Sequence, residues 1–573
     1  MKVLPSLVIL ACYLLSYQLL AATPDSKPAQ VFTNPILPGG YPDPSICRDG
    51  EDFYIVNSTF EYFPGLPIHH SKDLVNWELI GYGLHRESQV SNEVNLIDVQ
   101  SDGGIHAPTL RCRDGKFYII TTNVYVPPGS KDTQFVNFVI TADNPRGPWS
   151  EPKVLEGAPG IDPDIFFDDD GRVWYVGTRS PENPNFAGEG EIWLQEIDTQ
   201  TWSLIGKRHA LWRGACGGIW VEGPHMYKQD GKYYLMVAEG GTSFNHAVMI
   251  AVSDEITGPF ISNERNPIMT TRHLSYRNWV HSTGHADIVQ LQDGRWYMVL
   301  LGIRSEEGTA SNMGRETHLV PMDWEREPFW WKEEKHLWPV VAPQTGRVER
   351  HTPVPFEGTV QRRSLAFKDN FEASALALNW NFRRLPKDNT YSLKTRPGYL
   401  RLFTDENVIH ERARASLMGF RQTATEFDYT ASMTFTPSNN NSEAGIILFQ
   451  KDNNYISFTA KPYGDKWQLT AKHSEVGDNE QHIIGVHVLN QMFIPPPKGP
   501  IYFRFLSQDG RYRLAYSTDN GNTYHPFASA PSDGVISRKY TGAYLGVYAT
   551  GNGVETGDYA DFDWVSYQGF EKQ

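Results

Sequence analysis

Short apolar segments recur along the whole chain and are separated by clusters of Gly, Pro, Asn and Asp. The segments are a few residues long and rich in aromatic and β-branched side chains, a pattern typical of strands joined by tight turns. Aromatic residues make up 13% of the 573 positions, and Gly and Pro number 49 and 38. The pattern therefore predicts an all-β protein, and the length predicts at least two domains.

A strand, a turn ending in glycine and an aromatic-rich strand follow one another five times. The turn glycines are Gly50, Gly115, Gly171, Gly231 and Gly294. They recur at intervals of about 55 to 65 residues, the length of a four-stranded blade with its loops. Isolated hairpins are marginally stable in water, so closure into a ring is favoured over a string of independent hairpins. We predict a five-bladed β-propeller over residues 31–345.

Beyond residue 345 the blade repeat ends. A segment rich in Pro, Thr and Arg, residues 346–364, is predicted to be a linker. Short alternating strands then follow without the repeat, for example at 399–403, 444–449 and 544–548. This spacing predicts a second domain over residues 365–570, a two-sheet β-sandwich.

Polar side chains stand just before each of the five predicted inner strands of the propeller. They are Asp43, His106, Asp162, Glu222 and His285. A single Asp before Pro is more often a turn former than a catalyst. Inner strands line a propeller's channel, however, so a closed ring would bring all five side chains to one funnel.

Three carboxyl groups at one funnel suit the hydrolysis of a glycosidic bond. Inversion needs one carboxylate to activate water and one carboxylic acid to protonate the leaving oxygen, roughly 6.5–9.5 Å apart. A third carboxylate near the acid would raise the pKa of that acid, because like charges disfavour ionisation. Aromatic side chains near the funnel, such as Phe60, Tyr62, Phe63 and Trp220, offer apolar faces to sugar rings.

The charge and the N-terminus restrict the partners and the location. The formal net charge of −15 argues against a nucleic acid or an anionic membrane, since both require concentrated positive charge, and favours a neutral partner. Residues 1–22 combine Met-Lys, an apolar run and small residues, which predicts a signal peptide and a secreted protein. An uncleaved anchor helix is the alternative for this segment.

Cysteine usage excludes a disulfide framework. Cys12 lies in the predicted signal peptide, which leaves Cys47, Cys112 and Cys216, an odd number. Cys47 and Cys112 occupy similar places in two successive repeats, so they either pair or remain separate buried thiols. The sequence pairs no thiol with a base or a second ligand, so neither a catalytic cysteine nor a zinc site is predicted.

The ordered motifs resemble glycoside hydrolase family 43. They are Tyr41-Pro42-Asp43-Pro44-Ser45, Ile161-Asp162-Pro163 and Val221-Glu222-Gly223-Pro224-His225. The family contains inverting β-xylosidases, α-L-arabinofuranosidases and arabinanases. The resemblance implies that Asp43 is the general base, that Glu222 is the general acid, and that Asp162 raises the pKa of that acid and orients it.

Looser matches imply further residues around the substrate. The segment from Thr59 to Gly65 is similar to the β-xylosidase branch, in which the residue matching Phe60 helps wall the sugar subsite. Trp220 is a further substrate-binding candidate. His285 matches a central histidine that orders water or a cation, and Arg304 matches an arginine that contacts substrate and acts on the carboxylates. The chain departs from the branch at His106, where Trp is common.

The C-terminal part resembles the concanavalin-like domain, a jelly roll, that follows many family β-xylosidases. The resemblance implies that a loop of this domain closes one side of the pocket. A carbohydrate-binding module is the alternative for this domain. Asp561 and Asp563 are candidates for a structural Ca²⁺ site, with ordinary solvated carboxylates as the alternative. No cofactor is otherwise expected.

The leading hypothesis is an exo-acting, inverting β-xylosidase that acts on xylo-oligosaccharides. The near alternative is an α-L-arabinofuranosidase, or a bifunctional enzyme, acting on side chains of arabinoxylan or arabinan. A sugar-binding propeller without catalysis and a retaining enzyme acting on fructosyl groups are weaker alternatives. The sequence leaves an oligomer open.

Overall fold

The computed structural model describes residues 30–215, 217–305, 312–327, 336–476, 483–534 and 540–571. The predicted signal peptide and Cys216 lie outside these residues. Within them the chain is all-β, and the helical elements are two short 3-10 turns, η1 (Glu87–Gln89) and η2 (Ser532–Gly534). None of the helices in this part of the chain is long and apolar enough to cross a membrane.

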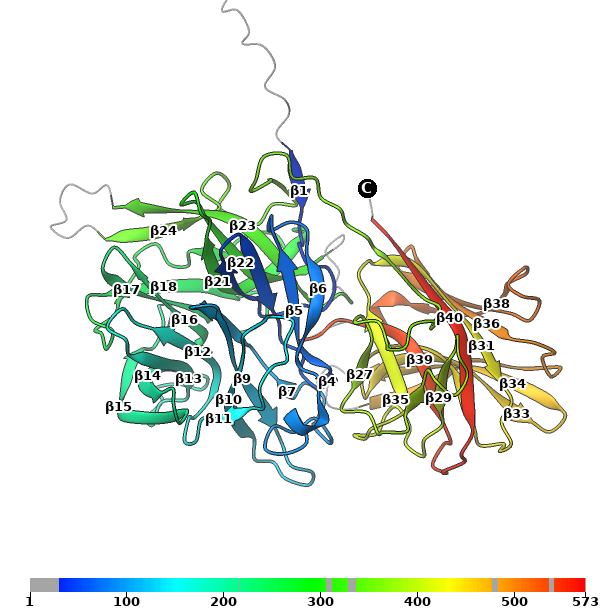
Figure 1. Cartoon of the computed structure of the whole chain (residues 1–573). Coiled ribbons are helices and arrows are strands. Elements are labelled where there is room, and N and C mark those ends of the chain that lie inside the picture. The colour runs from blue at the N-terminus through cyan, green and yellow to red at the C-terminus, as the bar shows by residue number, and fades with distance from the viewer. Residues whose placement is uncertain are drawn as a thin grey trace, which may run out of the picture.

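The N-terminal domain is a five-bladed β-propeller, as predicted (Figure 1). The strands of blade 1 are, from the inside outwards, β2 (Ser45–Asp49), β3 (Asp52–Val56), β5 (Gly65–Ser71) and β6 (Glu78–Leu84). Blade 2 contains β7 (Gly104–Ile105) and β8 (Thr109–Arg113) inside, followed by β9 (Lys116–Tyr125), β10 (Gln134–Ala142) and β11 (Lys153–Val154). Blade 3 contains β12 (Ile161–Phe167), β13 (Val173–Arg179), β14 (Glu191–Asp198) and β15 (Ser203–Trp212).

Two further blades complete the ring. Blade 4 contains β16 (Glu222–Gln229), β17 (Lys232–Glu239), β18 (Ala247–Ser253), β19 (Ile261–Ser262) and β20 (Met269–Thr270). Blade 5 contains β21 (Val280–Gln290), β22 (Trp296–Arg304), β23 (Arg315–Arg326) and β24 (Leu337–Val341). The inner strand β2 contacts both β8 and β21, so the ring is closed.

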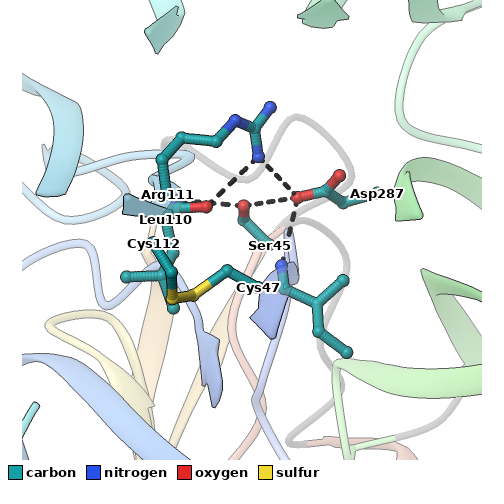
Figure 2. Close-up of a disulfide and its surroundings, with 7 residues drawn as sticks. Ser45, Cys47, Leu110, Arg111, Cys112 and Asp287 are labelled. Carbon is teal, nitrogen blue, oxygen red and sulfur yellow. Dashed lines mark hydrogen bonds and ion pairs between the residues drawn. A yellow bond between two sulfur atoms is a disulfide. The ribbon is translucent and has the colours of Figure 1, made fainter. Parts of the chain in front are cut away.

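Polar side chains of different blades bond to one another where the inner strands meet (Figure 2). The buried carboxylate of Asp287, on blade 5, accepts hydrogen bonds from Ser45 Oγ at 2.6 Å and from Tyr227 Oη at 2.7 Å. Arg111 of blade 2 forms ion pairs with Asp287 at 3.1 Å and with Asp164 of blade 3 at 2.8 Å. Side chains from all five blades thus meet in one hydrogen-bonded cluster.

A disulfide joins two neighbouring blades beside this cluster (Figure 2). Cys47 lies on β2 and Cys112 on β8, and their Cα atoms are 5.8 Å apart. The sequence left open whether these two cysteines pair or remain separate buried thiols, and the structure shows that they pair. The bridge closes a loop between residues that are 65 positions apart. It therefore restricts the unfolded chain over the whole length of one repeat.

We expect the Cys47→Ser/Cys112→Ser double variant to lose about 2–4 kcal/mol of unfolding free energy, because the closed loop is long. The midpoint of thermal unfolding should fall by several degrees. Thiol titration of the denatured wild-type protein should reveal two more thiols after reduction than before it. Equal counts with and without reductant would contradict the disulfide.

The C-terminal domain is a sandwich of two sheets (Figure 1). One sheet contains β26 (Ala366–Asp369), β28 (Tyr391–Ser392), β29 (Leu400–Phe403), β31 (Glu426–Phe435), β36 (Ile501–Gln508), β37 (Arg511–Ser517), β38 (His525–Pro531) and β40 (Tyr559–Phe570). The other contains β4 (Tyr62–Phe63), β27 (Asn381–Arg383), β30 (Leu417–Arg421), β32 (Glu443–Lys451), β33 (Asn454–Tyr463), β34 (Lys466–Val476), β35 (Ile483–Ile494) and β39 (Tyr544–Thr550).

Two segments connect the domains more closely than the sequence indicates. Strand β4 belongs to the propeller part of the chain, yet it pairs with β27 and extends a sheet of the sandwich. Its Tyr62 ring stacks on Tyr544 with centroids 4.1 Å apart. The predicted linker contains β25 (His351–Pro353), which pairs with β1 (Val31–Thr33) near the N-terminus. The linker is thus anchored to the propeller.

Candidate active site

Local backbone irregularities turn the inner-strand residues towards the channel. Asp43, Asp162 and His285 have positive φ angles of 49°, 55° and 44°. The register of β12 shifts between Ile161 and Asp164, and that of β16 shifts between Glu222 and His225. Bulges and left-handed residues change the direction of a side chain and cluster at functional sites. The chain therefore interrupts its strands at the positions that the repeat singled out.

All five side chains from the repeat line one cavity of about 440 Å³. The cavity is also lined by Phe60, Ala107, Ile161, Trp220, Gly240, Gly241, Thr242, Ser243, Asn245, Arg315 and Tyr540. The structure thus brings together Asp43, Asp162 and Glu222, which are far apart in the sequence. The candidates Phe60, His106, Trp220 and His285 also lie at this cavity.

The surroundings of Asp43 favour its ionised form. Its carboxylate accepts a hydrogen bond from Ser58 Oγ at 2.6 Å and lies 3.5 Å from Arg315 Nη1 and 3.7 Å from His285 Nδ1. Burial opposes ionisation, but these neighbours outweigh it, and the pKa of Asp43 lies below its usual value of 3.8. Burial also lowers the pKa of His285 to about 4, so Arg315 carries the nearby positive charge at neutral pH.

Asp162 and Glu222 are instead held towards their protonated forms. Burial raises the pKa of Glu222 to about 7, and the charge of Asp43 adds to this effect against the opposing charge of Arg315. Burial, then Glu222 and then Asp43 also raise the pKa of Asp162. The hydrogen bond that Asp162 accepts from the Gly223 N–H, at 3.1 Å, only partly offsets this. One cavity therefore contains an ionised carboxylate and a pair that retains a proton near neutral pH, the division that acid–base catalysis needs.

The arginine at the cavity is Arg315, so the placement predicted for Arg304 is wrong. Arg304 ends β22, and its guanidinium forms two bonds with the buried Glu316, at 2.7 and 2.9 Å. It lines a different cavity, at the junction of the two domains. Arg315 begins β23, the neighbouring strand, and contacts Thr242 as well as Asp43. The two arginines lie on paired strands but point to different sides of blade 5.

The sandwich supplies one wall of the cavity through Tyr540. Its ring stacks on Phe60 with centroids 5.2 Å apart, and the Arg315 guanidinium lies 4.7 Å from its centre. His106 meets Phe60 edge-on at 5.0 Å and is bonded through Nε2 to the Asp102 carbonyl at 3.1 Å. No pattern in the sequence singles out Tyr540, although the family resemblance implied that a sandwich loop closes the pocket.

Trp220 separates this cavity from a second, larger one. Its side chain is 58% exposed, and its φ of 46° lets it project from the loop before β16. The second cavity, of about 660 Å³, also includes Trp220, Ile161 and Glu222 in its lining. Glu222 therefore lies between two spaces. One can take the sugar that is released and the other the leaving group.

Asp561, one of the two candidate Ca²⁺ ligands, is bound by arginine side chains. Asp561 accepts bonds from Arg396 at 3.0 Å and from Arg401 at 2.8 and 3.0 Å, so two guanidiniums occupy the carboxylate proposed for Ca²⁺. In the part of the chain that the structure describes, no three His, Cys, Asp or Glu side chains cluster as metal ligands, around His285 or elsewhere.

Comparison with known proteins assigns both domains. The family model "Glycosyl hydrolases family 43" matches residues 32–329, which carry all five blades' inner strands. The chain belongs to glycoside hydrolase family 43. A second model, the β-xylosidase C-terminal concanavalin A-like domain, matches residues 368–568. This family 43 protein is a glycosidase with a propeller and a concanavalin-like sandwich.

Its similarity to named family 43 members extends over both domains. It is 37% identical over 555 residues to a xylosidase/arabinosidase of Butyrivibrio fibrisolvens, covering 94% of this chain and 99% of that protein. It is 35% identical to a non-reducing end α-L-arabinofuranosidase of Bacteroides ovatus, covering 94% and 95%. The solved xylan β-1,4-xylosidase of Bacillus halodurans superposes with a TM-score of 0.82 at 30% identity, covering 94% and 100%.

Proposed function

We propose that this protein removes single β-D-xylosyl residues from the non-reducing ends of xylo-oligosaccharides and inverts the anomeric configuration. The observation that carries the proposal is one cavity in which Asp43 is ionised and the pair of Asp162 and Glu222 retains a proton near neutral pH. Tyr540 and Phe60 close one side of the cavity, which suits the terminal sugar of a chain better than an internal one.

In the proposed reaction the chain's own groups move two protons. Asp43 accepts a proton from the water that attacks the anomeric carbon. Glu222 donates a proton to the glycosidic oxygen as the bond to the leaving group breaks. The bond from the Gly223 N–H holds Asp162 in place, while burial and the charge of Asp43 keep the pKa of Glu222 raised to about 7. Arg315 holds the pKa of Asp43 low and limits that of Glu222.

An α-L-arabinofuranosidase activity on the same site is the second candidate. His106 stands where Trp is common among β-xylosidases of the family, and a smaller polar side chain leaves more room beside Phe60. Relatives of both kinds share the two-domain arrangement. We therefore treat arabinofuranosyl side chains of arabinoxylan or arabinan as the alternative substrate.

We also propose that the protein is secreted through its N-terminal segment. Disulfides persist in oxidising compartments and are rare in the cytosol. The Cys47–Cys112 bridge therefore supports the location suggested by residues 1–22.

The decisive experiment compares 4-nitrophenyl β-D-xylopyranoside with the α-L-arabinofuranoside and follows xylobiose hydrolysis by NMR. We expect kcat/KM to be at least tenfold higher for the xyloside, with α-xylose as the first product. A higher value for the arabinofuranoside would favour the second candidate. First release of β-xylose would exclude inversion, and binding of xylobiose without hydrolysis would identify a sugar-binding protein.

A further inference from the structure

A separate cavity of about 220 Å³ lies where the propeller, the linker and the sandwich meet. It shares no lining residue with the active-site cavity. Three arginines line it: Arg304 at the end of β22, and Arg350 and Arg363 from the linker. The sandwich side contributes Ala424, Thr425, Phe570 and Glu571. Neither the family comparison nor the proposed reaction gives this cavity a role.

The positive charges at this cavity outnumber the carboxylates that face them. Glu316 neutralises Arg304 through two bonds. Glu571, which is half exposed, lies 3.3 Å from Arg363 Nη1. Arg350 stacks on Trp279 at 5.1 Å, and no carboxylate of the described residues is within ion-pair distance of it. Three arginines thus face two carboxylates, and the lining of the cavity carries one positive charge in excess.

Arg363 also has donors that its protein surroundings do not satisfy. Its Nε and Nη2 atoms are buried and have no hydrogen-bond partner among the described residues. Burial lowers the pKa of this guanidinium, and the charges of Arg304 and Arg350 act in the same direction. A buried charged donor without an acceptor destabilises the folded state, so an acceptor inside the cavity would be strongly favoured.

We infer that this cavity binds one small tetrahedral oxyanion, of the phosphate or sulfate type, between the propeller, the linker and the sandwich. The Nε and Nη2 donors of Arg363 form the planar fork that binds two oxygens of such an anion. Arg350 supplies the charge that no carboxylate balances. The volume admits one tetrahedral anion together with a few water molecules, each of which occupies about 30 Å³ in the liquid.

The test is equilibrium dialysis of the full chain against ³²P-labelled inorganic phosphate at constant ionic strength. We expect saturable binding of one phosphate per chain, with sulfate as a competitor and glucuronate as a poor one. Arg363→Gln and Arg350→Gln should each weaken binding at least tenfold. Arg347→Gln removes an exposed arginine of the same linker, paired with Glu349, and should bind as the wild type does.

Thermal unfolding gives a second measurement that does not depend on the buried substitution. Phosphate should raise the unfolding midpoint of the wild type saturably by several degrees, because a ligand that binds only the folded state stabilises it. If Arg363→Gln does not fold, the same measurement is made on Arg350→Gln, which changes a half-buried residue. The inference fails if phosphate binding is absent or unsaturable, if Arg350→Gln binds normally, or if glucuronate competes better than sulfate.

Discussion

Glu222→Gln is expected to lower kcat for xylobiose by about 10³-fold, because general acid catalysis contributes roughly 10²–10⁴-fold and Gln cannot donate the proton. The same variant should lose far less activity on 2,4-dinitrophenyl β-D-xylopyranoside. The dinitrophenolate leaves without protonation, so the acid is hardly needed. A large difference between the two substrates is therefore the signature of a lost acid, whereas general misfolding would lower both rates equally.

The pH profile provides an independent check on the same residue. Glu222 must be protonated to act, and its pKa is raised to about 7, so activity should fall as the pH rises through about 7. Asp43 must be ionised to act, and its pKa is lowered. The acidic limb of the pH profile should therefore lie below the usual pKa range of carboxylates. In Glu222→Gln the basic limb should disappear for the dinitrophenyl substrate.

A matched control separates this effect from a change in net charge. Glu156→Gln removes an exposed carboxylate just before β12 and should leave both rates within twofold of wild type. The acid assignment would be refuted if Glu222→Gln lost equal factors on xylobiose and the dinitrophenyl xyloside, or if its basic limb persisted.

The repeat made both the propeller and the position of its site predictable. A hairpin with a turn glycine that recurs at a regular interval identifies a series of blades, and the residue before each inner strand has an equivalent place in every blade. Asp43, His106, Asp162, Glu222 and His285 could therefore be grouped without knowledge of distances, and they line one cavity in the structure. Cys47 and Cys112 also occupy equivalent positions in two blades. Equivalence alone does not show that two thiols are close enough to form a disulfide, so only the structure could establish the bond.

The residues that the sequence missed lie outside the repeated positions. Arg315 begins a third strand, and Arg304 ends the second, so a motif around Arg304 could not reveal which of them faces the channel. Tyr540 lies more than three hundred positions after Glu222, in a domain without blades. Its contact with Phe60 depends on how two domains pack, and strand periodicity contains no information about that packing.

A buried cluster of charges next to Phe60 lies at the contact between the two domains. Asp452 of the sandwich forms ion pairs with Arg383 at 3.0 Å and Arg384 at 2.9 Å. It also accepts a hydrogen bond from Ser101 of the propeller at 2.9 Å. Burial raises the pKa of Glu61 to about 8, so this neighbouring carboxyl group is largely neutral at pH 7. Asp452 thus supplies the negative charge for two fully buried guanidiniums.

Asp452→Asn is therefore expected to lower the free energy of unfolding by about 3–5 kcal/mol, because it leaves two buried positive charges without a carboxylate. Arg384 also donates to the Val99 carbonyl of the propeller at 2.7 Å, so the loss should loosen the contact between the domains. Denaturant unfolding gives the stability, and the KM for xylobiose should rise several-fold because Phe60 and Tyr540 face each other across that contact.

Asp428→Asn provides the comparison within the same domain. Asp428 pairs with Arg504 at 2.5 Å, but both side chains are about 30% exposed, so its removal should cost no more than about 1 kcal/mol. Its side-chain partners, Arg504 and Thr430, both belong to the sandwich, so the substitution should leave KM unchanged. If Asp452→Asn were as mild as Asp428→Asn, the buried cluster would not hold the domains together. The position of Tyr540 over the active site would then depend on the pairing of β4 with β27 and the stacking of Tyr62 on Tyr544.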